Sequence, residues 1–157
     1  MIRTKLEHGV LEIELCHEPM NEIGTAMLGA LEGIDLGKAR AVLLYSSLKQ
    51  GFCAGADLNW MKRMAGYGYE QNLADAQALA AMLRTLDRMA KPTVARVHGP
   101  AFAGGVGLVA ACDIAIGVPA AKFCLSEAKL GLSPATISPY VVRAMGGQID
   151  AVALGDE

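Results

Sequence analysis

The chain has 157 residues, of which 53% are apolar and 19% are charged, and its formal net charge is −2. This apolar fraction excludes a disordered chain, and the length predicts a single domain with its own core. A near-neutral, slightly acidic chain does not attract phosphate backbones, so we expect no nucleic-acid partner. No apolar run approaches the ~20 residues that span a bilayer, so we expect no membrane partner.

The cysteines and the N-terminus indicate the compartment. The first residues lack the apolar segment of a signal peptide, and the four cysteines are scattered without a CxxC pair. No His, Cys and Asp residues show the spacing of metal ligands. We therefore expect a cytoplasmic protein with reduced cysteines and no metal site.

The first third of the chain predicts a strand-strand-helix-strand order. Residues 2–6 and 10–15 alternate apolar and polar side chains around a His-Gly pair, which predicts a hairpin. The spacing of apolar residues predicts a helix over 23–34. A continuous apolar run at 41–45 is typical of a strand covered on both sides, and a loop is expected over 49–57.

The remainder continues the alternation of strands and helices. An apolar stripe predicts a helix from about residue 70 to 89, which a Lys-Pro pair ends. A glycine-rich loop is expected to open a second helix at Gly104 or Gly105. Further strands are predicted over 93–98, 113–116 and 122–125. This alternation predicts an α/β fold.

Two loops of small residues, 51–58 (GFCAGADL) and 98–107 (HGPAFAGGVG), each follow a predicted strand. Small side chains let a ligand approach the backbone, so that amide N–H groups can donate to it. Two such groups converging on one oxygen would form an oxyanion hole. Glycine content alone fits tight turns equally well. A dinucleotide-binding fingerprint fits poorly, because Ala110 stands where its third glycine is needed.

The segments FCAGADLNWM, ARVHGPAFAGGVGLVAACDIAI and AKFCLSEAKLGLSP together resemble the crotonase (enoyl-CoA hydratase/isomerase) family over residues 8–146. Within it, the chain is most similar to bacterial methylglutaconyl-CoA and isohexenylglutaconyl-CoA hydratases of leucine and terpene breakdown. The resemblance implies a ClpP/crotonase-like spiral of ββα units that binds an acyl-CoA thioester between the two loops. Coenzyme A is then part of the substrate, and no separate cofactor is implied.

The same resemblance implies roles for individual residues. The backbone N–H groups of Ala56 and Gly104 would form the oxyanion hole, and Glu127 would be the catalytic acid and base. Trp60 would line an acyl pocket or pack in the core, and Asp57 would contact substrate or orient its loop. The other substrate-binding positions are Phe52, Ala54, Gly55 and Gly105.

One position departs from the family pattern. Many crotonases use two glutamates, and Gly107 stands at the first of these positions, whereas Glu127 stands at the second. A carboxyl group in an apolar pocket has a raised pKa, which suits proton transfer near neutral pH. A solvated glutamate at a helix start is the alternative for Glu127.

Three functions follow as expectations. The first is hydration of a 2-enoyl-CoA, whose acyl group is branched and resembles methylglutaconyl. The second is isomerisation of a 3-enoyl-CoA to a 2-enoyl-CoA, for which one glutamate suffices. The third is a non-catalytic acyl-CoA-binding protein or an inactive fragment.

Members of the family usually continue well past Gly146, with helices that cover the acyl pocket and build trimers or hexamers. We expect residues 1–146 to form a crotonase-like acyl-CoA-binding core and 147–157 an atypical tail of a C-terminally truncated chain. Apolar surface is then expected to be exposed, and the family implies a homo-oligomer.

Overall fold

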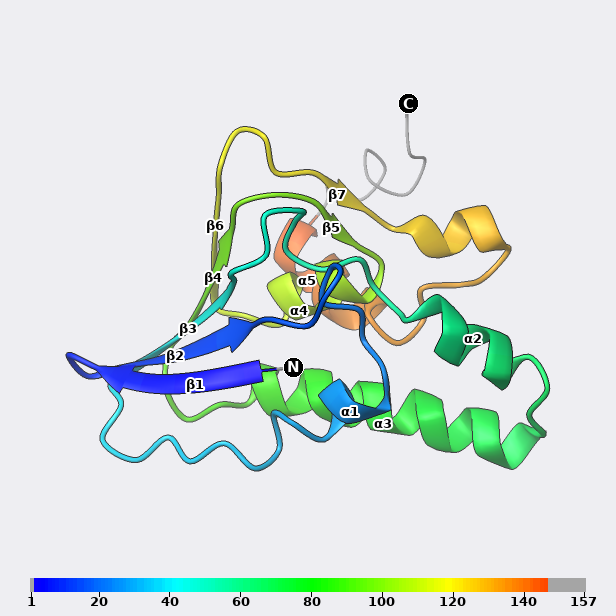
Figure 1. Ribbon diagram of the computed structural model, residues 1–157, viewed down its shortest axis with the longest axis horizontal. Coiled ribbons are helices and arrows are strands. Elements are labelled where there is room, and N and C mark those ends of the chain that lie inside the picture. Colours follow the sequence, from blue (N-terminus) through cyan, green and yellow to red (C-terminus); the bar gives the residue numbers. More distant parts are fainter. Residues whose placement is uncertain (1, 147–157) are drawn as a thin grey trace.

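A five-stranded sheet organises the fold in this computed structural model, which describes residues 2–146 (Figure 1). Its strands, in spatial order, are β1 (Ile2–Glu7), β2 (Val10–Leu15), β3 (Ala41–Ser46), β4 (Thr93–Val97) and β6 (Ile114–Gly117). β1 pairs antiparallel with β2, and the other neighbours pair in parallel. The predicted hairpin is confirmed, since His8 and Gly9 have φ values of 50° and 79°, as a two-residue turn of this kind requires.

Helices connect the parallel strands, as parallel pairing requires. These helices are α1 (Thr25–Leu28), α2 (Leu58–Met64), α3 (Tyr69–Asp87) and α4 (Gly104–Ala110). The 3₁₀ helix η1 (Ser126–Leu130) and α5 (Ser138–Met145) follow the last strand. In Figure 1, α1 and α3 lie below the strands, and α2 lies on the right beside the far end of α3. A small parallel sheet joins β5 (Ala101–Phe102) to β7 (Phe123–Cys124). The predicted α/β class is confirmed, as is the start of a helix at Gly104.

The helix predicted over 23–34 is wrong in length. α1 ends at Leu28, and Gly29 follows as its C-terminal cap. Glycine costs helical stability relative to alanine, and Gly33 repeats the interruption one turn later. Leu28 and Leu31 are nevertheless buried. The spacing of the apolar residues therefore indicated which side chains are buried, but not a continuous helix.

The main core lies where alternate residues of β2 and β3 meet the inner face of α3. Ile13, Leu44, Leu83 and Leu86 are each 0% exposed. β2 and β3 bury every second residue, as a sheet with one strongly covered face does. The strand predicted over 41–45 is therefore covered well on one side and only partly on the other.

The edge strand β6 is exposed along its whole length. Ile114 and Ile116 are 51% and 58% exposed, and Val118 and Phe123 nearby are also exposed. Within residues 2–146, no helix is both long and apolar enough to cross a membrane. The tail predicted over 147–157 lies outside the described residues.

Candidate active site

A cavity of about 400 Å³ brings together residues far apart in the sequence. Its walls come from the loop before α2, from α2 and α3, from the first turn of α4, and from η1 with the loop after it. Five of the residues singled out in the sequence line this cavity, namely Ala54, Ala56, Trp60, Gly104 and Glu127. The lining is otherwise mainly apolar, so charges within it are screened less than in water.

The amide N–H groups of Ala56 and Gly104, two residues that line the cavity, have no protein acceptor among residues 2–146. Ile23 donates to Gly55 O at 2.7 Å, and Asp57 N donates to Ile23 O at 3.0 Å. Alternate amides of an extended segment point to opposite sides, so Ala56 N–H points away from Ile23. Gly104 is the first residue of α4, and a helix leaves its first N–H groups without an internal partner.

The close approach of the two loops explains their glycines. Gly55 has a φ of +89°, and a Cβ built there would lie 2.8 Å from Ala103 Cβ and 3.5 Å from Gly104 N. A Cβ at Gly105 would lie 2.8 Å from Cys53 Cβ. Gly55 and Gly105 therefore act through packing and do not line the cavity. Their packing holds the loop that carries Ala56 against the turn that carries Gly104, and both of these residues line the cavity.

Ala103 has an unusual backbone conformation at the start of α4. Its φ and ψ are 47° and −118°, a combination that L-residues rarely adopt. The Ala103 N–H donates to Cys124 O at 2.9 Å, which anchors the turn to β7. Such strain is typical of functional turns, and here it directs the chain into Gly104.

Phe52 and Asp57 have structural positions rather than places on the cavity. Phe52 is 0% exposed in the core. Its N–H donates to Pro100 O, and its carbonyl accepts from Asn21 Nδ2, each at 2.8 Å. The Asp57 side chain caps α2 by accepting from Asn59 N at 2.7 Å. The Asp57 side chain thus holds the start of α2, and the Phe52 side chain is part of the core.

Glu127 is a half-buried carboxyl group with an unsatisfied oxygen. Its Oε2 atom is buried and has no hydrogen-bond partner within the described part of the chain. Burial raises the pKa of Glu127 above its ordinary value, because desolvation disfavours the charged form. Leu130 lines the same cavity, whereas Phe123 lies outside it. A buried carboxyl oxygen without a partner and a raised pKa both favour proton exchange with a ligand in the cavity.

Gly107, which stands at the first of the two glutamate positions described above, is covered by another side chain. A Cβ built at Gly107 would lie 2.5 Å from Ile137 Cγ2 and 3.5 Å from Leu83 Cδ2. Ile137 is 2% exposed and lines the cavity. The space above Gly107 is therefore filled by a hydrocarbon side chain, and Glu127 has no carboxylate partner there.

Asp75, which the sequence analysis did not single out, also lines the cavity. Its Oδ2 atom accepts a hydrogen bond from Trp60 Nε1 at 3.2 Å. A signal for it was present, because Asp75 precedes Leu79 by one helical turn and so continues the buried stripe of α3. An acidic residue at one of the positions that form the apolar face of a helix is expected to point toward the interior.

Comparison with known proteins shows the family of the chain. The family model described as Enoyl-CoA hydratase/isomerase matches residues 5–154. The chain belongs to the enoyl-CoA hydratase/isomerase family. It is 42% identical over 103 residues to Enoyl-CoA hydratase AKT6-1 of Alternaria alternata, covering 66% of this chain and 33% of that protein.

Solved enoyl-CoA hydratase/isomerase family structures share its fold. An enoyl-CoA hydratase from Shewanella pealeana superposes with a TM-score of 0.84 at 39% identity, over 99% of this chain and 61% of that one. AtuE of Pseudomonas aeruginosa superposes with a TM-score of 0.89 at 33% identity, over 98% and 62%. The chain thus spans about a third of the curated relative and about three fifths of the solved ones. The crotonase-like fold is confirmed.

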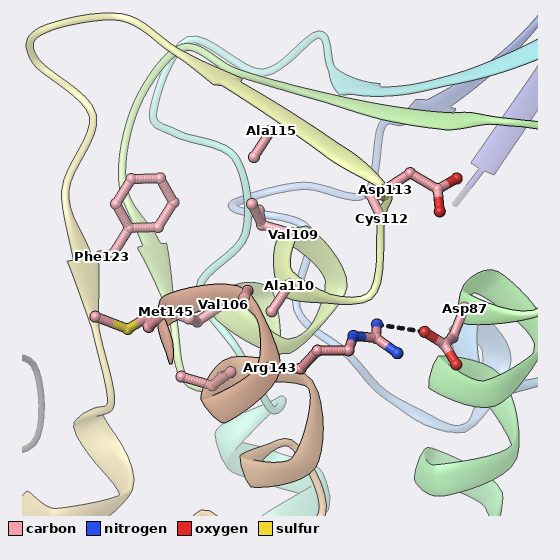
Figure 2. Close-up of a pocket in the computed structure, with 12 residues that line it drawn as sticks. Asp87, Val106, Val109, Ala110, Cys112, Asp113, Ala115, Phe123, Arg143 and Met145 are labelled. Atoms are coloured by element: carbon pink, nitrogen blue, oxygen red, sulfur yellow. Dashed lines mark hydrogen bonds and ion pairs between the residues drawn. The ribbon is translucent and has the colours of Figure 1, made fainter. Parts of the chain in front are cut away.

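This enoyl-CoA hydratase/isomerase family member has a second cavity, of about 800 Å³. Figure 2 shows Arg143 of α5 paired with Asp87 of α3 at one side, and Phe123 and Met145 at the other. None of the predicted site residues lines it, and its walls are mostly apolar. Within residues 2–146, no group of three His, Cys, Asp or Glu residues is placed to hold a metal ion.

Proposed function

We propose that this chain hydrates a 2-enoyl-CoA thioester through an enolate, using one carboxylate. The observation that supports the proposal is that Ala56, Gly104 and Glu127 line one cavity, while neither amide N–H has an acceptor and Glu127 Oε2 has no partner among the described residues. These groups supply two donors for an anionic oxygen and one proton carrier. No separate cofactor is needed for this chemistry.

The two amides would stabilise the charge that develops on the substrate. Addition of water to C3 of a 2-enoyl thioester places negative charge on the thioester oxygen. Fixed N–H dipoles at that oxygen need no reorganisation, and one such donor is typically worth ~2.7–4 kcal/mol. Neither amide is occupied by another acceptor among the described residues, so both are available to the thioester.

Glu127 would carry the proton in both halves of the reaction. As the carboxylate, it takes a proton from water while the water oxygen bonds to C3. The enolate then collapses, and Glu127 returns that proton to C2. The water thus supplies the hydroxyl at C3 and the hydrogen at C2. Burial, which raises the pKa of Glu127, matches it to this alternation.

Isomerisation of a 3-enoyl-CoA is the second candidate. Glu127 would remove a proton from C2, the same two amides would stabilise the enolate, and the proton would return at C4. The packing of Ile137 on Gly107 favours this candidate, since isomerisation needs no second carboxylate to hold a water molecule.

Several finer features also belong to the proposal. The resemblance implied a branched acyl group such as methylglutaconyl. We propose only the branched chain, and 3-methylglutaconyl-CoA serves as a test substrate. We further propose a cytoplasmic location and self-association. The last is supported by Ile114, Ile116 and Phe123, which are large, apolar and exposed.

The test is turnover of crotonyl-CoA, 3-methylglutaconyl-CoA and a 3-enoyl-CoA by the full chain, with products identified by mass and chromatography. Hydration gives a 3-hydroxyacyl product, and isomerisation gives a 2-enoyl product of unchanged mass. We expect Glu127→Gln to lower kcat by about 10²–10⁴-fold. Glu70→Gln, on the exposed first turn of α3, is the matched control. Binding without turnover would support a non-catalytic acyl-CoA-binding protein instead.

A further inference from the structure

Asp75 places a carboxylate on the wall of the candidate active site, on an element different from that of Glu127. Its Oδ2 atom accepts a hydrogen bond from Trp60 Nε1 at 3.2 Å, and both residues line the cavity. Trp60 is 4% exposed, so the indole is held on two sides, by packing and by this bond. The hydrogen bond fixes the acid where α2 and α3 meet.

The charged residues that line the described part of the cavity are both acidic. They are Asp75 and Glu127, and no Lys, Arg or His is among the described lining residues. Lys62 and Arg63 of α2 are exposed and do not line it. The uncharged polar groups are the hydroxyls of Ser126, Ser133 and Thr136.

This lining determines which acyl groups the cavity favours. A carboxylate inside it would find no counter-charge and would face two groups of its own sign. Like charges repel more strongly in a cavity of low polarity than in water, and an unpaired buried charge is disfavoured. A hydrocarbon chain instead meets the apolar side chains of Met64, Leu79 and Leu130.

We propose that the cavity selects acyl-CoA thioesters with an uncharged acyl chain, and that Asp75 is the specificity-determining residue against a terminal carboxylate. The inference rests on the proposed function, because it places the acyl chain in this cavity. A volume of about 400 Å³ leaves room for a branched hydrocarbon chain. The methylglutaconyl group, which ends in a carboxylate, falls outside this class.

Trp60 provides the readout, because it is the one tryptophan of the chain and stands on the cavity wall. The full chain is titrated with isovaleryl-CoA and with 3-methylglutaryl-CoA while tryptophan fluorescence is recorded. These two thioesters share a branched skeleton and differ by one carboxylate, and neither has a double bond to hydrate. We expect isovaleryl-CoA to bind about tenfold more tightly or better, since like charges brought together are strongly disfavoured.

Variants separate the charge of Asp75 from its hydrogen bond. Asp75→Asn keeps an oxygen acceptor for the indole and removes the charge, so we expect the preference to fall about threefold or more. Asp75→Glu keeps the charge and should keep the preference. Glu70→Gln removes an exposed acid from the same helix and should leave the preference unchanged. Circular dichroism checks that each variant is folded.

The outcomes distinguish this inference from the proposed function. Equal affinity of the wild-type chain for both thioesters, or an unchanged preference in folded Asp75→Asn, overturns the inference alone. Binding of neither thioester overturns the proposed function and the inference with it. If Asp75→Asn does not fold, the wild-type preference and its retention in Asp75→Glu decide the matter.

Discussion

Gly107 and Ile137 are in direct contact, and a Cβ at position 107 would lie 2.5 Å from Ile137 Cγ2. Ile137 immediately precedes α5, so this contact joins α5 to α4 above the candidate active site. Because the neighbouring Leu83 is also buried, a side chain added at Gly107 has little room. The absence of a carboxylate at position 107 is therefore built into the packing of the site.

The first prediction tests this contact. Gly107→Ala should lower the free energy of unfolding by about 1–3 kcal/mol, because overpacking forces side chains and backbone to shift. Adding Ile137→Ala removes the clashing methyl group, so the double variant should be more stable than the sum of the two single effects predicts. Urea denaturation of the four proteins measures the coupling. Strict additivity would show that the two positions do not touch.

The second prediction concerns the pH dependence of stability at Glu127. Its pKa in the folded chain lies above the ordinary value of 4.5, so the unfolded chain releases this proton at lower pH. The stability that the protonated carboxyl contributes is present below pH 4.5 and is lost as pH rises through the folded-state pKa. As pH rises from 4.5 through the folded-state pKa, the free energy of unfolding of the wild-type chain should therefore fall more than that of Glu127→Gln. A difference that stays constant with pH would contradict the raised pKa.

The third prediction concerns the placement of the Gly104 amide. A Cβ at Gly104 would lie 2.7 Å from Ile23 Cδ1, so Gly104→Ala should displace the loop or the Ile23 side chain. Small displacements at a reacting centre are costly, and we expect kcat to fall by about tenfold or more. Ile23→Val removes the Cδ1 atom and should restore activity in the double variant. Failure of this rescue would mean that the loss arises elsewhere.

The sequence foretold some parts of the site because their signals are local. The His8-Gly9 turn has a backbone that its residue types favour, and α4 begins at Gly104, the first residue of the GGVG segment. Glu127 was identified by motif and lies on the cavity with its unsatisfied oxygen. In each case a few neighbouring residues carry the whole signal.

Other parts depended on contacts between distant segments. Phe52 stands in a loop motif, yet its side chain enters the core because Pro100 and Asn21 bind its backbone. Ile137 covers Gly107 across thirty residues of chain, which spacing alone does not encode. The position of Asp75 on the buried face of α3 follows from the helical spacing. Its hydrogen bond with Trp60 does not, because Trp60 lies on another helix.

The fourth prediction concerns Gly55. Its φ of +89° and the 2.8 Å approach of Ala103 Cβ leave no unstrained place for a side chain. We expect Gly55→Ala to lower the free energy of unfolding by ~1–3 kcal/mol and to weaken acyl-CoA binding, because the two loops would separate. Gly29→Ala meets nothing within 4 Å and is the matched control. Equal stability of the two variants would contradict the close approach of the loops.

The fifth prediction concerns the exposed edge strand. Ile114 and Ile116 are two residues apart on β6, so they share one face of the strand. Light scattering coupled to size-exclusion chromatography should show self-association of the wild-type chain. Ile116→Lys should lower the measured mass, because an edge lysine opposes pairing. A wild-type monomer at every concentration tested would rule out association through this face.

The most direct measurement is a crystal structure of the chain with acetoacetyl-CoA, an unreactive thioester. We predict that its thioester oxygen lies about 2.7–3.1 Å from the amide nitrogens of both Ala56 and Gly104, with Glu127 facing C2 and C3. A thioester oxygen out of reach of either amide, or a ligand bound outside this cavity, would contradict the proposed chemistry.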